Sequence, residues 1–142
     1  MESVSLSIIR RLTDTREMEL RDVAAILPKR TNDHLDFYPL ASLIKGGYLD
    51  LWLETNGEPL RDQNEMELTL TLYMWVVGGS KEFEYRGIRQ HGGDFGKEKV
   101  FATAKAYFLL DEMRTKRWER LWAFAAGILT AIIATSLRGL VD

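Results

Sequence analysis

Hydrophobic residues recur at helical spacing along the first part of the chain. In residues 5–12 the apolar side chains fall at positions 6, 8, 9 and 12, which indicates a helix. The same period returns in residues 20–27 and stops before Pro28, because the residue preceding a proline avoids the α region. Between these two predicted helices, residues 18–20 favour a short strand.

A third predicted helix follows after a short polar turn. Thr31 or Asn32 supplies a side chain suited to capping its first turn, and Gly46 with Gly47 supplies the usual glycine at a helix end. Pro39 falls inside this helix, where it removes one backbone hydrogen bond and is expected to kink the axis.

The hydrophobic period changes from helical to alternating in the middle of the chain. Residues 48–54 alternate in the manner of a strand, and residues 66–77 are rich in side chains that favour strands. The polar segment 55–65 between them predicts a long turn. Further short strands are predicted at 83–88 and 100–103.

The last predicted helix begins at Ala104 and has no stop signal before Arg138. Within it, residues 121–137 carry no charge and show no polar face, whereas a helix of a small soluble domain keeps one. Residues 121–141 would span about 31 Å, close to the roughly 30 Å of a bilayer core. The sequence therefore predicts a single transmembrane helix at 121–141, with an interfacial helix or a helix covered within an oligomer as alternatives.

Residues around the predicted span agree with this placement. Tryptophans occur where an interfacial aromatic belt lies, and basic residues are more frequent before the span than after it. By the positive-inside rule, this asymmetry predicts a single-pass protein whose N-terminal domain is cytosolic. The predicted membrane flank consists of Arg114, Lys116, Arg117, Trp118, Arg120, Trp122 and Arg138.

Small residues recur at every fourth position along the predicted span. Such a row allows helix backbones to approach closely in lipid, so a homo-oligomer formed through this helix is one hypothesis. The plain alternative is that alanine and glycine are common in membrane spans. The candidate packing row is Ala123, Gly127, Ala131 and Thr135.

Two stretches, PLASLIKGGYLDLWLE at 39–54 and FATAKAYFLLDEM at 101–113, resemble segments of the winged helix-turn-helix family. The resemblance extends over residues 4–115 and implies an α+β fold with three helices and a β-hairpin wing. We therefore expect a cytosolic winged-helix-like domain at 1–103 and a connecting helix at 104–120, followed by the transmembrane helix. Small bacterial and phage proteins with a winged helix and one C-terminal span are similar in layout, and this similarity implies no named activity.

The family resemblance also implies candidate contacts with DNA. In winged-helix proteins the third helix enters the major groove and a wing contacts the phosphate backbone. Residues 1–110 carry 14 basic and 17 acidic side chains, a net charge of −3, which weakens DNA binding and favours a protein partner. The candidate nucleic-acid contacts are Lys29, Arg30, Thr31, Asn32, His34, Lys45, Arg86 and Arg89.

No group of residues predicts catalysis. The chain has no cysteine, and its two histidines, His34 and His91, have no carboxylate partners that complete a set of metal ligands. The glycine-rich loop that follows His91 matches neither a P-loop nor a dinucleotide-binding motif. We assign no catalytic residue, no metal ligand and no cofactor.

These observations predict a non-enzymatic, tail-anchored protein of the lipid bilayer whose winged-helix-like domain binds a protein partner. A first alternative is a membrane-tethered, DNA-binding transcriptional regulator. A second alternative is a small membrane-active phage or defence effector.

Overall fold

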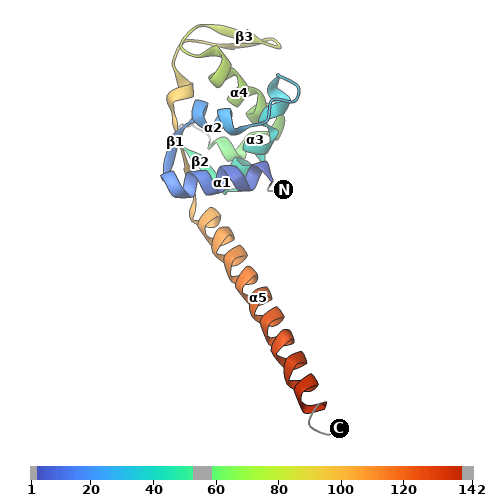
Figure 1. The fold of residues 1–142 in the computed structure, drawn as a ribbon. Coiled ribbons are helices and arrows are strands. Elements are labelled where there is room, and N and C mark those ends of the chain that lie inside the picture. The colour runs from blue at the N-terminus through green and yellow to red at the C-terminus, as the bar shows by residue number, and fades with distance from the viewer. Residues whose placement is uncertain (1–2, 53–58, 139–142) are drawn as a thin grey trace. The chain divides into compact units, whose positions relative to one another are not determined.

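The computed structural model describes residues 3–52 and 59–138, with side chains as far as residue 134 (Figure 1). The chain is α+β, with helices and two small antiparallel sheets, which confirms the predicted fold class at that level. Its contacts divide it into two compact units, Met1–Tyr107 and Phe108–Asp142.

The first two helices and the strand between them lie where the hydrophobic spacing predicts them. α1 (Val4–Thr15) is capped by Ser3, whose side chain accepts a hydrogen bond from the backbone N–H of Leu6. β1 (Glu17–Glu19) follows, and α2 (Leu20–Ile26) begins directly after it. The two helices contribute to one core the buried side chains Ile8, Ile9, Leu12, Leu20, Val23 and Ala24.

The three-stranded sheet brings together segments that are far apart in the sequence (Figure 1). β5 (Lys99–Ala102) lies in the centre, with β1 on one side and β2 (Leu49–Leu51) on the other, all antiparallel. Val100 of β5 is fully buried and stands opposite Met18 of β1 and Leu51 of β2. The sheet confirms the strands predicted at 18–20, 100–103 and 48–54, although residues 53 and 54 lie outside the described residues.

The third predicted helix is present, but its start and its geometry were predicted wrongly. A short 3₁₀ helix, η1 (His34–Phe37), comes first, and Asp33 rather than Thr31 or Asn32 caps it by accepting a hydrogen bond from Leu35. α3 (Tyr38–Lys45) starts directly after η1. Pro39 therefore falls in the first turn of α3, where backbone N–H groups have no partner within the helix and a proline costs nothing.

Residues 66–77, predicted as a strand, form a helix instead. α4 (Glu65–Gly78) begins after Asn64, whose side chain accepts a hydrogen bond from the Met66 N–H. Apolar residues occupy every side of this segment, so their spacing alone does not separate a strand from a buried helix. The predicted hairpin wing is consequently absent at this place, because β2 pairs with β5. The buried side chains of α4 are Leu68, Thr69, Leu72, Met74 and Trp75.

A separate two-stranded hairpin follows α4. β3 (Phe83–Tyr85) pairs with β4 (Ile88–Gln90), and Arg86 and Gly87 connect them with φ angles of 50° and 80°. Two consecutive positive φ angles are typical of the type I′ turn, whose twist matches that of paired strands. This hairpin and α1 lie at opposite ends of the first unit in Figure 1.

α5 (Ala104–Arg138) begins at the predicted residue, and its start is fixed to the residues that follow α3. The backbone N–H of Thr103 donates a hydrogen bond to the carbonyl of Tyr48, at 3.0 Å. The Lys105 ammonium donates to the Gly46 carbonyl at 2.6 Å and lies 4.6 Å from the centre of the Tyr48 ring. Ala106 is fully buried, so the first turn of the helix belongs to the core.

Candidate interaction surfaces

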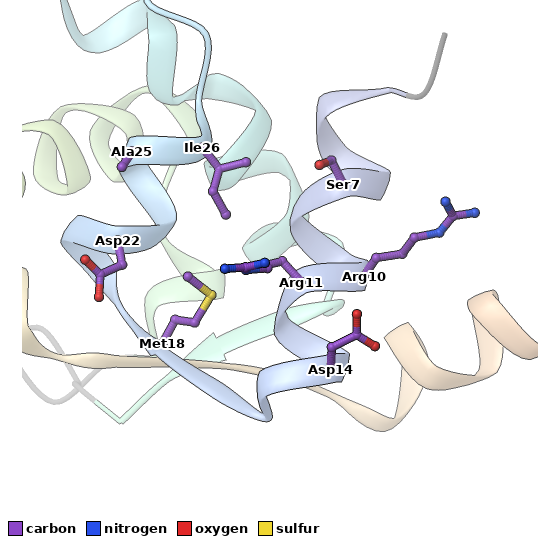
Figure 2. Close-up of a pocket in the computed structure, with 8 residues that line it drawn as sticks. All are labelled: Ser7, Arg10, Arg11, Asp14, Met18, Asp22, Ala25 and Ile26. Carbon is purple, nitrogen blue, oxygen red and sulfur yellow. The ribbon is translucent and has the colours of Figure 1, made fainter.

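A groove of about 650 Å³ lies between α1 and α2 in the first unit (Figure 2). Its walls come from the exposed faces of the two helices, and Met18 of β1 lies between them. Figure 2 shows Arg11 extending from α1 into the groove, toward Met18, while Arg10 points away. The lining residues are Ser7, Arg10, Arg11, Asp14, Met18, Asp22, Ala25 and Ile26.

The chemistry of this groove suits binding rather than catalysis. Met18, Ala25 and Ile26 provide apolar surface, and the Arg11 guanidinium makes no hydrogen bond or ion pair with the residues that the structure describes. Asp22 supplies the opposite charge from α2. An amphipathic peptide presents both an apolar and a charged side, which matches such a surface.

A second groove of about 410 Å³ lies among α2, the loop before η1, and α4. Phe37, Val76 and Tyr73 supply much of its apolar surface. Burial and the neighbouring Tyr85 hydroxyl raise the pKa of Tyr73 above its ordinary value, so this phenol stays protonated at neutral pH.

The loop before η1, where four of the candidate DNA contacts lie, is organised around Asp36. The Asp36 carboxylate accepts hydrogen bonds from the backbone N–H groups of Arg30, Thr31 and Asn32, at 2.9–3.0 Å, and from the Thr31 hydroxyl. These donors, the backbone N–H of Thr31 first, hold the pKa of Asp36 below its ordinary value. Because the carboxylate occupies these N–H groups, they are not available to a phosphate. Lys29 lies beside them and is exposed.

Replacing Asp36 with asparagine is expected to destabilise the first unit at neutral pH. An Asp whose pKa is lowered by folding stabilises the folded state above its unfolded pKa, and this contribution disappears as pH falls through the lowered value. The thermal midpoint of Asp36→Asn should therefore lie below that of the wild type at pH 7, and the gap should close as the pH falls through the lowered pKa of Asp36. Circular dichroism melts at pH 7 and at the lowest pH at which both proteins fold measure this. A gap of equal size at both values would contradict the assigned role.

His34, predicted as an exposed DNA contact, is buried at 1% exposure. Its Nδ1 lies 3.2 Å from the hydroxyl of Tyr85 on β3, and the two rings are tilted with their centres 5.8 Å apart. The hydrophobic spacing of the sequence misses this, because η1 turns His34 inward against the hairpin. In this fold His34 packs the hairpin onto the core and does not reach a surface ligand.

The polar side chains of α3, Ser42 and Lys45, are exposed and hydrogen-bonded to the segment that leads into α4. The Lys45 ammonium donates hydrogen bonds to the carbonyls of Arg61 and Gln63, at 3.1 and 2.5 Å. The Ser42 hydroxyl donates to Glu65 at 2.6 Å, and the Tyr38 hydroxyl lies 3.5 Å from the sulfur of Met66. The outward side chains of α3 are thus engaged within the protein.

The remaining candidate DNA contacts, Arg86 and Arg89, lie on the hairpin. Arg89 forms an ion pair with Glu84 across the two strands, at 2.8 Å, and Arg86 lies 5.7 Å from the centre of the Tyr85 ring. Arg86 directly follows Tyr85, whose hydroxyl lies 3.2 Å from Nδ1 of His34, so this end of the hairpin packs against the start of η1.

The glycine-rich loop after His91 ties α2 to η3 (Phe95–Lys97). The Asp94 carboxylate accepts hydrogen bonds from Arg21 at 2.9 and 3.1 Å and forms an ion pair with Lys97 at 3.1 Å. Lys97 and then Arg21 hold the pKa of Asp94 below its ordinary value. The Asp94 carboxylate of this loop therefore links α2 to η3 through its contacts with Arg21 and Lys97.

In the second unit, α5 exposes large apolar side chains along its described length. No residue from Leu121 to Ala134 is charged, and all of them are exposed. Thr130 is the one polar residue of this stretch, and its hydroxyl donates to the carbonyl of Ala126 at 2.8 Å, as expected for a hydroxyl in an apolar helix. Between Leu121 and Ala134 the most exposed large side chains are Leu121, Trp122, Phe124, Leu129, Ile132 and Ile133.

The structure describes the side chains of only part of the predicted packing row and of the predicted membrane flank. Among the row, a Cβ added at Gly127 would meet nothing within 4 Å, and the side chain of Thr135 lies outside those described. Among the flank, Lys116 forms an ion pair with Glu112 at 2.6 Å, and Trp118 and Trp122 are 54% and 71% exposed. The side chain of Arg138 is also outside the described part.

Within the described residues, no helix holds a stretch that is both long and apolar enough to be a candidate membrane span. The predicted span at 121–141 includes residues 139–141, which lie outside the described residues. No protein-family model matches this sequence, and no curated protein or solved structure matches it either.

Sequence reasoning missed the α1–α2 groove and Arg11. The signal was present, since Arg11 lies on the polar side of a predicted helix, but a groove depends on how α1 and α2 pack. Nothing in the local sequence specifies that packing.

Proposed function

We propose that this chain is a membrane-anchored interaction protein, in which the first unit binds a protein partner and α5 holds it at the bilayer. The observation that carries the proposal is the exposed, uncharged surface of α5 from Leu121 to Ala134. An apolar surface of this length on a helix outside the compact core needs a cover, and lipid covers such a helix on all sides. The span extends in this proposal over residues 121–141.

A winged-helix-like scaffold for the first unit is part of the proposal. Its support is the element order of three helices with β1 between the first two, together with a sheet in which β5 lies between β1 and β2. In this interpretation the segment between β2 and β5, which contains α4 and the β3–β4 hairpin, replaces a simple wing.

The hydrogen bonds that engage the exposed polar side chains of α3 favour a protein partner over DNA. A recognition helix reads base edges with its outward side chains, but those of α3, such as Ser42 and Lys45, are hydrogen-bonded to residues 61–65. The Asp36 carboxylate occupies the backbone N–H groups of Arg30, Thr31 and Asn32, which a phosphate would otherwise use. The α1–α2 groove remains as an open surface of mixed apolar and charged character for the partner.

Fractionation of cells that produce the full-length protein tests the membrane anchor. Alkaline carbonate removes proteins that are held on membranes by electrostatic or protein contacts, but leaves integral proteins in the membrane pellet. We expect the wild-type chain to remain in the pellet after this wash. Recovery of the chain in the supernatant would refute the anchor, and the apolar surface of α5 would then require a protein cover.

A further inference from the structure

Three arginines line one side of α5 just before its uncharged stretch. Arg114, Arg117 and Arg120 follow one another at intervals of three residues, which places their side chains on neighbouring positions of one helix face. All three are exposed, and none forms an ion pair or hydrogen bond with the residues that the structure describes. We call these residues the arginine strip.

The other charges of this segment do not neutralise the arginine strip. Glu112 is engaged with Lys116 at 2.6 Å, and this contact lowers the pKa of the Glu112 carboxyl. At about 100° per residue, Glu119 points to the side of the helix opposite Arg117. Asp111 lies one turn before Arg114 but forms no ion pair with it in the described part of the chain. The net charge of the segment is small, yet its positive charge is concentrated on one face.

We propose that the arginine strip binds the headgroups of anionic phospholipids, so that the anchor prefers anionic over zwitterionic lipid. The proposal rests on the membrane anchoring proposed above. A guanidinium matches a phosphate or carboxylate oxygen pair with two parallel hydrogen bonds, and it is the side chain best suited to such groups. Each basic residue near an anionic membrane surface strengthens binding by about fivefold.

The depth of the three residues supports a headgroup contact. With Leu121 at the edge of the hydrocarbon core, Arg120, Arg117 and Arg114 lie about 2, 6 and 10 Å above it along the helix. The headgroup layer of one leaflet is roughly 5–7 Å thick. Two of the guanidiniums are then inside this layer, and the long side chain of Arg114 reaches its outer edge. Trp118 and Trp122 occupy the same depth.

Tryptophan quenching by brominated lipids directly tests the proposed preference for anionic lipid. Full-length protein is reconstituted in vesicles of phosphatidylcholine and phosphatidylglycerol in which one lipid class at a time is brominated. Quenching of Trp118 and Trp122 then reports which class lies next to the helix, and a variant with phenylalanine at both positions gives the contribution of Trp52 and Trp75. We expect phosphatidylglycerol to be enriched at least fivefold over phosphatidylcholine at the wild-type helix.

Variants of the arginine strip test whether its positive charge, rather than the guanidinium group itself, causes the lipid preference. Replacing Arg114, Arg117 and Arg120 together with glutamine should reduce the enrichment to about one, whereas replacing all three with lysine should retain most of it. The matched control is Glu112→Gln with Lys116→Gln, which removes a neutralised pair and should leave the enrichment unchanged.

Two results would overturn the proposal. Equal quenching by the two lipid classes in the wild type would refute the preference for anionic lipid while leaving the anchor intact. Unchanged enrichment in the glutamine variant would refute the assignment to these arginines. Absence of quenching by either class has a different meaning, because it would refute the membrane anchor itself and with it the contact of the strip.

Discussion

Replacing Leu129 and Ile133 with aspartate is expected to release the full-length protein from membranes. Both side chains lie near the middle of the proposed span, and they are 61% and 52% exposed on α5. An aspartate near the middle of a span costs about 3 kcal/mol on insertion, roughly a hundredfold, and two of them cost correspondingly more. Carbonate fractionation of the double variant should therefore move the protein from the pellet to the supernatant.

Two controls make this result specific to the anchor. Replacing Leu129 and Ile133 with valine keeps both sites apolar and should leave the protein in the membrane. Ile88→Asp places a charge on another exposed apolar residue, in the β3–β4 hairpin, and should not alter fractionation. If the double aspartate variant stays in the carbonate pellet, α5 does not hold the protein in lipid.

The second large expected effect is a loss of folding stability when a buried leucine of α4 is truncated. Leu72 is fully buried there, so Leu72→Ala removes packed methyl groups and leaves a cavity. We expect a loss of about 3 kcal/mol in the free energy of unfolding, within the range measured for buried leucines. Urea unfolding in detergent, followed by the fluorescence of the buried Trp75 on the same helix, measures this change.

Val77→Ala is the matched control for this measurement. Val77 lies one and a half turns further along α4 and is 51% exposed, so its truncation should cost less than about 1 kcal/mol. Equal costs at the two sites would contradict the packing of α4 described above.

The elements that sequence predicts well are those specified by local signals. Residues 5–12 and 20–27 have a clear helical period, and each becomes a helix with one buried face. α4 fails because its apolar residues lie on all sides, so its period is uninformative. Its true signals were the cap at Asn64, the acidic first turn and a length of 14 residues, all of which favour a helix.

Features of the candidate surfaces were harder to predict, because they depend on contacts between distant segments. Lys45 looks like a free basic side chain in the sequence, yet its ammonium is bound by carbonyls 16 and 18 residues further along. His34 looks exposed at a predicted helix start, yet it meets Tyr85, 51 residues away. By contrast, the arginine strip follows from helical geometry alone, since a long helix without tertiary contacts keeps its sequence spacing on its surface.

The position of β5 has a mechanical consequence for the proposed anchoring through α5. Only Thr103 separates β5 from α5, so a force applied along α5 enters the first unit at the strand in the centre of its sheet. Both neighbouring strands then share the load through their hydrogen bonds, and the contacts of Thr103 and Lys105 with Tyr48 and Gly46 take the first part of it. A tether joined to an edge strand would load only one row of hydrogen bonds, whereas this connection distributes tension over two.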